Sequence, residues 1–221
     1  MFSRQNRGKD NASPLGALQR LAGIQSSEEQ CDFCSVPLGS AHRHVLEIAT
    51  RKVLCTCDPC GLRFEGVNGG RYKLIPRRAR RLPNVNLTDL QWASLSLPIE
   101  LAFIFQSTPL QSPVALYPSP SGLIESRVPL TSWKALVAEN PRLGQMEPDI
   151  EAFLGNRTGN AREYYLVPID ACFELAGVIR VHWRGLTGGT TVWKEVGNFF
   201  SRLRSGEPGQ GTVARVEVGH A

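Results

Sequence analysis

The sequence contains no long run of apolar residues. Within its 221 residues, no uncharged stretch reaches the roughly 18 apolar residues that a membrane-spanning helix needs. The first residues, Met1 to Arg7, lead into polar sequence, whereas a secretory signal needs an apolar stretch of about 7 to 15 residues. We therefore expect a cytoplasmic protein with no membrane partner.

The sequence also lacks the short motifs that mark common catalytic sites. Neither the GxGxxG nor the GxxxxGKS/T loop that holds nucleotide phosphates is present, and no GxSxG elbow presents a serine nucleophile. Cys172 lies on the apolar face of a predicted helix, where a buried core thiol is favoured over a reactive one. We expect that the protein is not an enzyme.

Cysteine is nearly absent outside one short segment. The chain has six cysteines, and five of them fall between residues 31 and 60. In a reducing compartment such a cluster does not indicate a disulfide framework, because glutathione and thioredoxin keep thiols reduced. Clustered thiols in that setting indicate a bound metal ion.

Two CxxC pairs, which we call the knuckles, supply four metal ligands. They are Cys31-Asp-Phe-Cys34 and Cys57-Asp-Pro-Cys60, with 22 residues between them. Two thiolates three residues apart can reach one ion, and two such pairs complete a tetrahedral site. Gly61 follows the second knuckle, where we expect a backbone that turns sharply around sulfur. Zinc is the favoured cofactor, although tetrahedral sulfur ligation also suits a single iron ion.

Other ligands lie within reach of these four. A hairpin predicted over residues 44–57 carries the second knuckle back to the first. In the register that we expect, His44 lies opposite Cys57, and His44 and Cys55 share one face of the sheet. His44 or Cys55 can therefore replace one knuckle cysteine, and His42 is also close. The choice of the fourth ligand stays open.

A basic segment follows the cysteine-rich region. Eleven residues carry six cations, which are Arg71, Lys73, Arg77, Arg78, Arg80 and Arg81. Beside a zinc ribbon these cations can contact phosphates of a nucleic acid. They can equally form a solvated linker or a patch for an acidic protein surface. The sequence shows no pattern of a DNA-recognition helix, and the net charge of +5 is only a modest excess of cations.

The rest of the chain alternates short strands and helices. Apolar runs bounded by proline and serine over residues 101–128 predict an antiparallel meander. Residues 149–154 predict a helix with Pro148 in its first turn, and Asp170 is predicted to cap another helix. The clearest helical pattern runs over residues 192–203.

The fold class that follows is α+β, with a small zinc-ribbon-like head and a mixed domain of short antiparallel strands and helices. The expected domains are a flexible tail with a short helix at 1–30, a zinc-ribbon-like module at 31–70, a basic strand and linker at 71–86, an α+β domain at 87–206, and a disordered tail at 207–221.

Several motifs together resemble an uncharacterised bacterial family of domain-of-unknown-function type. The resemblance covers residues 31–204. It rests on Cys31-Asp-Phe-Cys34, His42-Arg-His44, Leu54-Cys-Thr-Cys-Asp-Pro-Cys60, Tyr117-Pro-Ser-Pro120, Val167-Pro-Ile-Asp-Ala-Cys172 and Trp183-Arg-Gly-Leu-Thr-Gly-Gly189. Members of that family look like zinc-ribbon proteins, and some are encoded near nickel-iron hydrogenase genes. The resemblance implies an accessory role in assembling, metallating or regulating such a complex, and it offers no catalytic residues to carry over.

The function that we expect is therefore a non-catalytic zinc-binding accessory or protein-interaction factor, with hydrogenase subunits as partners that the resemblance implies. Two alternatives remain. The first is a zinc-ribbon regulator that binds nucleic acid through the basic segment, and the second is a rubredoxin-like electron carrier that holds iron.

Overall fold

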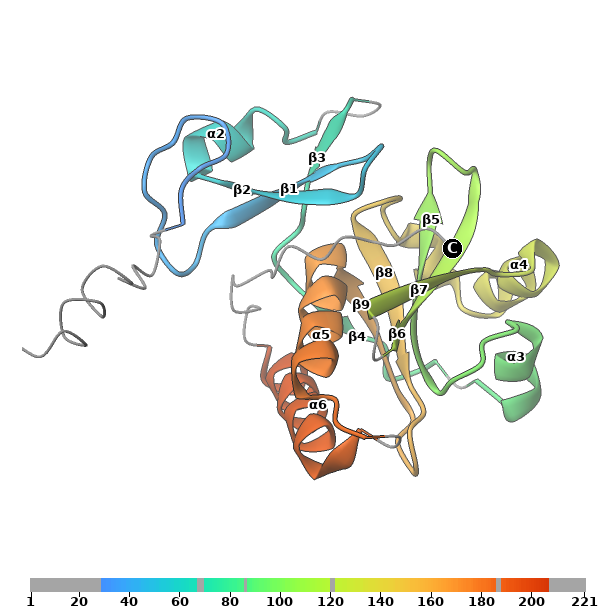
Figure 1. Ribbon diagram of the computed structural model, residues 1–221. Helices are drawn as coiled ribbons and strands as arrows, with labels where there is room; N and C mark the ends of the chain where they lie inside the picture. The colour runs from blue at the N-terminus through green and yellow to red at the C-terminus, as the bar shows by residue number, and fades with distance from the viewer. Residues whose placement is uncertain (1–28, 67–69, 86, 120–121, 186–187, 207–221) are drawn as a thin grey trace, which may run out of the picture.

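The chain folds into a small three-stranded sheet and a larger six-stranded sheet with helices on both faces (Figure 1). The computed structural model describes residues 29–66, 70–85, 87–119, 122–185 and 188–206. The fold class is α+β, as predicted. The predicted tails, including the short helix near the amino terminus, lie mostly outside the described residues. Among the residues that are described, no helix is both long and apolar enough to cross a membrane.

The small sheet and a short helix form the part that we call the head. The strand order is β2-β1-β3, and all the pairings are antiparallel. The head elements are β1 (Arg43–Glu47), β2 (Lys52–Thr56), α2 (Asp58–Leu62) and β3 (Tyr72–Leu74). Strand β3 comes from the basic segment, so the beginning of that segment belongs to the head sheet and is not a free linker.

The predicted hairpin is present, but its predicted register is wrong by two residues. His44 pairs with Cys55 and not with Cys57. The reason is the bend, which begins at residue 48 and ends at Arg51, whose φ of 54° places it in the left-handed region. Because a shift of two residues preserves the alternation of faces, His44 and Cys55 still lie on one face of the sheet.

The large sheet forms the centre of the part that we call the body. Its strand order is β4-β9-β8-β5-β6-β7, with antiparallel neighbours throughout. The strands are β4 (Arg80–Arg81), β5 (Leu101–Ser107), β6 (Ser112–Ser119), β7 (Gly122–Arg127), β8 (Glu151–Asn156) and β9 (Glu163–Pro168). The meander predicted over residues 101–128 corresponds to β5, β6 and β7 and is confirmed.

The helix predicted over residues 149–154 is wrong, because most of this segment is strand β8. Ala152, Phe153 and Leu154 are all fully buried, so both faces of the segment are covered. A short run that is apolar at consecutive positions has no helical periodicity to distinguish a buried strand from a buried helix. The positive φ of 70° at Asp149 also interrupts a helix at the predicted start.

Helices cover both faces of the body sheet. On one face lie α5 (Ile169–His182) and α6 (Gly189–Ser205), and on the other lie α3 (Asp89–Ser94), α4 (Leu130–Glu139) and the 3-10 helix η1 (Pro141–Gln145). Alternate residues of β8 point to opposite faces, so that Leu154 packs with α5 and α6 whereas Phe153 packs with α4. The body is therefore a three-layer arrangement of helix, sheet and helix.

The head packs directly against the body. Leu46 of β1 and Ile75, just after β3, are buried in the same apolar cluster as the α5 and α6 face of the sheet. Lys73 of β3 is buried as well, and its Nζ lies 3.1 Å from Asp149 Oδ2 and 2.9 Å from the Pro148 carbonyl oxygen. The limits that we set for the separate domains stay a prediction.

Candidate metal centre

The four knuckle cysteines meet at one end of the head. Their sulfur atoms all lie within 4.8 Å of one another, although one knuckle precedes the hairpin in the chain and the other follows it. Cys31 and Cys34 precede β1, Cys57 lies at the amino end of α2, and Cys60 is inside that helix. All six cysteines of the chain are free thiols.

The spacing of these sulfurs fits a tetrahedral metal ion. Cys34 Sγ lies 3.7 Å from Cys57 Sγ. Two sulfurs bound tetrahedrally to zinc, with bonds of about 2.3 Å, are about 3.8 Å apart. The donor set therefore fits zinc or a single iron ion, and a bound ion would hold the two knuckles together.

Backbone hydrogen bonds hold the first knuckle in place. The Ser35 N–H donates to the Cys31 carbonyl over 2.8 Å, and Ser35 has a positive φ of 60°. The Asp32 N–H donates to the Cys55 carbonyl over 2.9 Å, and Asp32 Oδ2 accepts the Cys55 N–H over 2.7 Å. Because Asp32 is bonded to both backbone groups of Cys55, the first knuckle is tied to strand β2.

Gly61 has a different role from the one that we predicted. It lies inside α2 and is not at a sharp turn. A β-carbon at this position would lie 3.1 Å from Arg43 Cδ, which is tighter than ordinary packing, and 3.4 Å from Thr56 Cγ2, at the short limit of ordinary contact. Glycine therefore allows α2, with Cys60, to approach β1 and β2 closely.

The thiols of the cluster differ in acidity. Burial raises the pKa of Cys31, but backbone hydrogen bonds at Cys57, Phe33 and Cys34 outweigh burial and lower the pKa to about 6. The pKa of Cys60 is raised to about 12, mainly by its side-chain hydrogen bonds to Cys57 and Cys34. Four sulfurs this close become thiolates together only when a cation neutralises them, because like charges disfavour ionisation.

Three aromatic rings pack beside the knuckles. The centroid of Phe33, from the first knuckle, lies 5.0 Å from that of Phe64, and both rings contact Tyr72 of β3 edge-on. The guanidinium of Arg71 lies 5.1 Å from the centroid of the Tyr72 ring. Tyr72, an aromatic residue of the basic segment, is thus part of the packing of the head.

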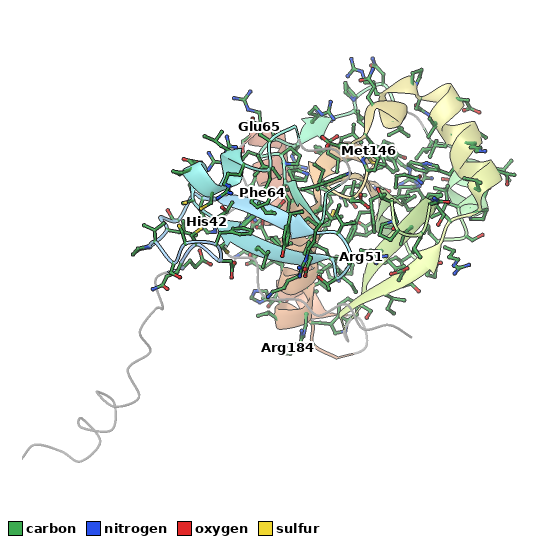
Figure 2. All side chains as sticks on the ribbon, turned by 90° about the horizontal axis from the view of Figure 1, so that it is seen from above. His42, Arg51, Phe64, Glu65, Met146 and Arg184 are labelled. Carbon is green, nitrogen blue, oxygen red and sulfur yellow. The ribbon has the colours of Figure 1, made fainter. Side chains whose placement is uncertain are left out.

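A second group of candidate ligands lies beside the first. His42, His44 and Cys55 have ligand atoms within 4.8 Å of one another. The structure thus places His44 and Cys55, our candidate substitutes for a knuckle cysteine, in a separate group with His42, which lies in the head (Figure 2). His44 Nε2 lies 3.1 Å from His42 Nε2.

A residue of the body holds His44. The Nδ1–H of His44 donates a hydrogen bond to Oδ2 of this residue, Asp170, over 2.7 Å. Burial lowers the pKa of His44, but the hydrogen bonds to Asp170 and Cys55 outweigh it and raise the pKa to about 9. The prediction that Asp170 caps a helix is wrong, because α5 begins at Ile169 and Asp170 lies in its first turn. The hydrogen bond between His44 and Asp170 was not predicted from the sequence.

Acidic partners surround much of the basic segment. Four of its six cations form ion pairs, which are Arg71 with Glu47, Lys73 with Asp149, Arg77 with Asp58 and Arg80 with Glu151. Arg78 and Arg81 are exposed and form no ion pair with the described residues. The segment is therefore largely neutralised by the fold.

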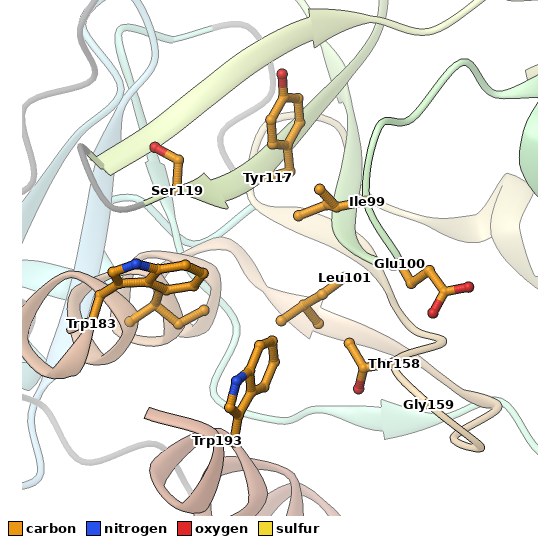
Figure 3. Close-up of a pocket in the computed structure, with 10 residues that line it drawn as sticks. Ile99, Glu100, Leu101, Tyr117, Ser119, Thr158, Gly159, Trp183 and Trp193 are labelled. Carbon is orange, nitrogen blue, oxygen red and sulfur yellow. The ribbon is translucent and has the colours of Figure 1, made fainter. Parts of the chain in front are cut away.

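A separate apolar pocket lies in the body, with a volume of 690 Å³ (Figure 3). Its walls include Leu101, Tyr117, Ile179, Trp183 and Trp193. The two tryptophan rings come from the end of α5 and from α6, and their centroids are 6.4 Å apart. This pocket was not predicted from the sequence, because apolar periodicity within one helix does not indicate a space between two helices.

Comparison with known proteins places the chain in a family. No curated protein and no solved structure matches it. The profile of a family of unknown function, DUF5947, matches residues 30–207, from just before the first knuckle to just past α6. The match covers most of the chain, including both groups of candidate metal ligands and the whole body. The chain therefore belongs to the DUF5947 family of unknown function.

Proposed function

We propose that this protein is a non-catalytic, zinc-binding accessory factor that acts by contacting another protein. The observation that carries the proposal is the closed set of four cysteines, with knuckle sulfurs 3.7 Å apart. Zinc sites with four protein ligands are structural, whereas catalytic zinc sites keep one position for water or substrate. In this proposal the zinc ion fixes a zinc-ribbon-like head, and the head presents the contact surface.

Apolar side chains beside the knuckles support a protein partner. Val36 follows the first knuckle and is 44% exposed, and Leu62 follows the second and is 55% exposed. Phe33, inside the first knuckle, is 37% exposed. Zinc binding orders both knuckles, so it would also order these side chains for contact.

The basic segment favours this proposal over a nucleic-acid regulator. Phosphate binding depends on cations that are free to replace counterions. The ion pairs of Arg71, Lys73, Arg77 and Arg80 already engage these cations. Arg78 and Arg81 remain as exposed cations that suit the acidic rim of a protein partner.

The resemblance to a bacterial family with members encoded near nickel-iron hydrogenase genes points to the partner. We propose that the partner is a subunit of such a complex, and that the protein serves its assembly or regulation in the cytoplasm. A rubredoxin-like carrier remains the competing function for the same four sulfurs. The identity of the bound metal distinguishes the two functions, because an electron carrier needs iron and a structural site needs zinc.

Affinity purification of the full chain from its native host tests the proposal. A hydrogenase subunit should be recovered with the zinc-loaded wild type, and the Val36→Ser and Leu62→Ser variants should recover less of it. The matched control is Leu90→Ser, because Leu90 is an exposed leucine of the body, in α3. Recovery of nucleic acid alone, equal recovery with the head variants, or iron in place of zinc would overturn the proposal.

A further inference from the structure

We infer that His42, His44 and Cys55 form a second metal site, which takes a late first-row divalent transition-metal ion and leaves one coordination position open. The site is distinct from the four-cysteine group, and it shares no ligand with it. The inference goes beyond the proposed function, which depends only on the four cysteines.

Hydrogen bonds fix which nitrogen of each imidazole carries a proton. His42 Nδ1 lies 2.9 Å from the Gly39 carbonyl oxygen, and His44 Nδ1 lies 2.7 Å from the Asp170 carboxylate. Both partners only accept hydrogen bonds, so each Nδ1 must carry a proton. In a neutral histidine the other nitrogen, Nε2, then bears a free lone pair.

The Nε2 lone pairs of the two imidazoles lie close together in a buried place. The two Nε2 atoms lie 3.1 Å apart. The two side chains are only 3% and 6% exposed, so water does not screen them. Two lone pairs at this distance repel unless a positive charge lies between them. That charge is either a proton, which makes one ring an imidazolium, or a metal ion.

Cys55 favours the metal ion over the proton. A shared proton needs only two nitrogens, but the Cys55 sulfur also lies within 4.8 Å of a ring nitrogen of each histidine. Two nitrogens bound tetrahedrally to zinc at about 2.0 to 2.1 Å are about 3.3 Å apart, close to the separation of the two Nε2 atoms. Binding would displace the Cys55 thiol proton to solvent and leave a thiolate ligand.

The outer hydrogen bonds are those of a metal site. Metal-bound histidines donate their other N–H to a carboxylate or a backbone carbonyl, which fixes the ring and makes the ligand more basic. His44 has the carboxylate and His42 the carbonyl, with Glu29 Oε2 3.6 Å from His42 Nδ1 as a second acidic neighbour. Asp170 belongs to α5, so the site joins the head to the body.

The ligand set identifies the class of metal. Imidazole and thiolate ligands suit zinc, nickel, copper and cobalt and disfavour magnesium and calcium, which prefer oxygen. Among the described residues, the group contains three ligands and no fourth His, Cys, Asp or Glu. A tetrahedral ion would therefore take its fourth ligand from water or from a bound molecule.

Metal titration of the full chain tests this inference. The metal-free protein is loaded with Co²⁺ or Zn²⁺, and bound ions are counted after gel filtration. Wild type should bind two ions, whereas His42→Ala and Cys55→Ser should bind one. His182→Ala should still bind two, because His182 belongs to neither group. Asp170→Asn, which keeps all three ligands, should lower the affinity for the second ion about 10- to 100-fold.

X-ray absorption of the wild type gives a second readout that needs no variant. The first equivalent of zinc should show sulfur neighbours alone, and the second should add imidazole scattering. A single bound ion that is retained in both His42→Ala and Cys55→Ser, or a second ion that persists unchanged in both variants, would overturn the inference and leave a shared proton. Failure of the four-cysteine site gives a different result from failure of the second site. If the four cysteines bind no metal, Cys34→Ser leaves the metal content unchanged.

Discussion

His44 in the first strand of the head donates a hydrogen bond over 2.7 Å to Asp170 in the first turn of α5. The two residues are 126 positions apart in the chain. This contact orients a candidate metal ligand from outside the head. The position of the head on the body and the geometry of the second candidate metal site therefore depend on each other.

The ion pair between Lys73 and Asp149 is another buried polar link between head and body. We expect Lys73→Met to lower the free energy of unfolding by about 3 kcal/mol, because it leaves the Asp149 carboxylate buried without its cation. Urea unfolding at constant pH measures the change. Arg71→Met, at an ion pair whose arginine is 71% exposed, should cost much less. Equal losses in the two variants would contradict this account.

Two glycines should respond in opposite directions to the same substitution. A β-carbon at Gly155 of β8 would lie 2.7 Å from the Trp92 ring, so Gly155→Ala should destabilise the body by about 1 to 3 kcal/mol. Gly197 lies within α6 and has open space around it. Gly197→Ala should therefore stabilise the protein by about 1 kcal/mol. Thermal unfolding of both variants checks the pair, and a stabilised Gly155→Ala would refute the packing.

Local sequence patterns predicted the features that depend on neighbours in the chain. The CxxC spacing predicted which cysteines converge, and the apolar periodicity predicted α6. Thr88 and Gln91, which are three residues apart, form the capping box at the start of α3. In each case the residues that determine the structure lie within a few positions of one another.

Features that depend on distant packing were not predictable in the same way. The hairpin register depended on a left-handed Arg51, and β8 depended on burial by helices on both faces. The hydrogen bond between His44 and Asp170 requires the head to dock on α5. No local periodicity records such a docking, because it results from the whole apolar interface.

Nucleic-acid binding should be weak and insensitive to the loss of Arg78 and Arg81, which form no ion pair with any described residue. At low salt, we expect the wild type to bind DNA or RNA no more tightly than the double variant Arg78→Ser and Arg81→Ser. The other four cations of the segment are ion-paired, so they are not free to neutralise phosphates. Fluorescence anisotropy with labelled oligonucleotides measures both proteins. Salt-dependent binding by the wild type that disappears in the variant would revive the nucleic-acid function.

Removal of metal should loosen the head before the body. Structural zinc contributes about 10 to 16 kcal/mol in small peptides, far more than burial in a module this small supplies. All four tryptophans lie in the body, from Trp92 to Trp193. A chelator should therefore open residues 31–66 to protease while tryptophan fluorescence changes little. A simultaneous shift in tryptophan emission would mean that head and body unfold as one unit.

The metal content of the purified full chain tests the four-cysteine zinc site most directly. We predict one tightly held zinc ion that is retained in the double variant His42→Ala and Cys55→Ser and lost in Cys34→Ser and in Cys57→Ser. Iron in place of zinc, or a zinc content that replacing either knuckle cysteine does not lower by one ion, would contradict the account.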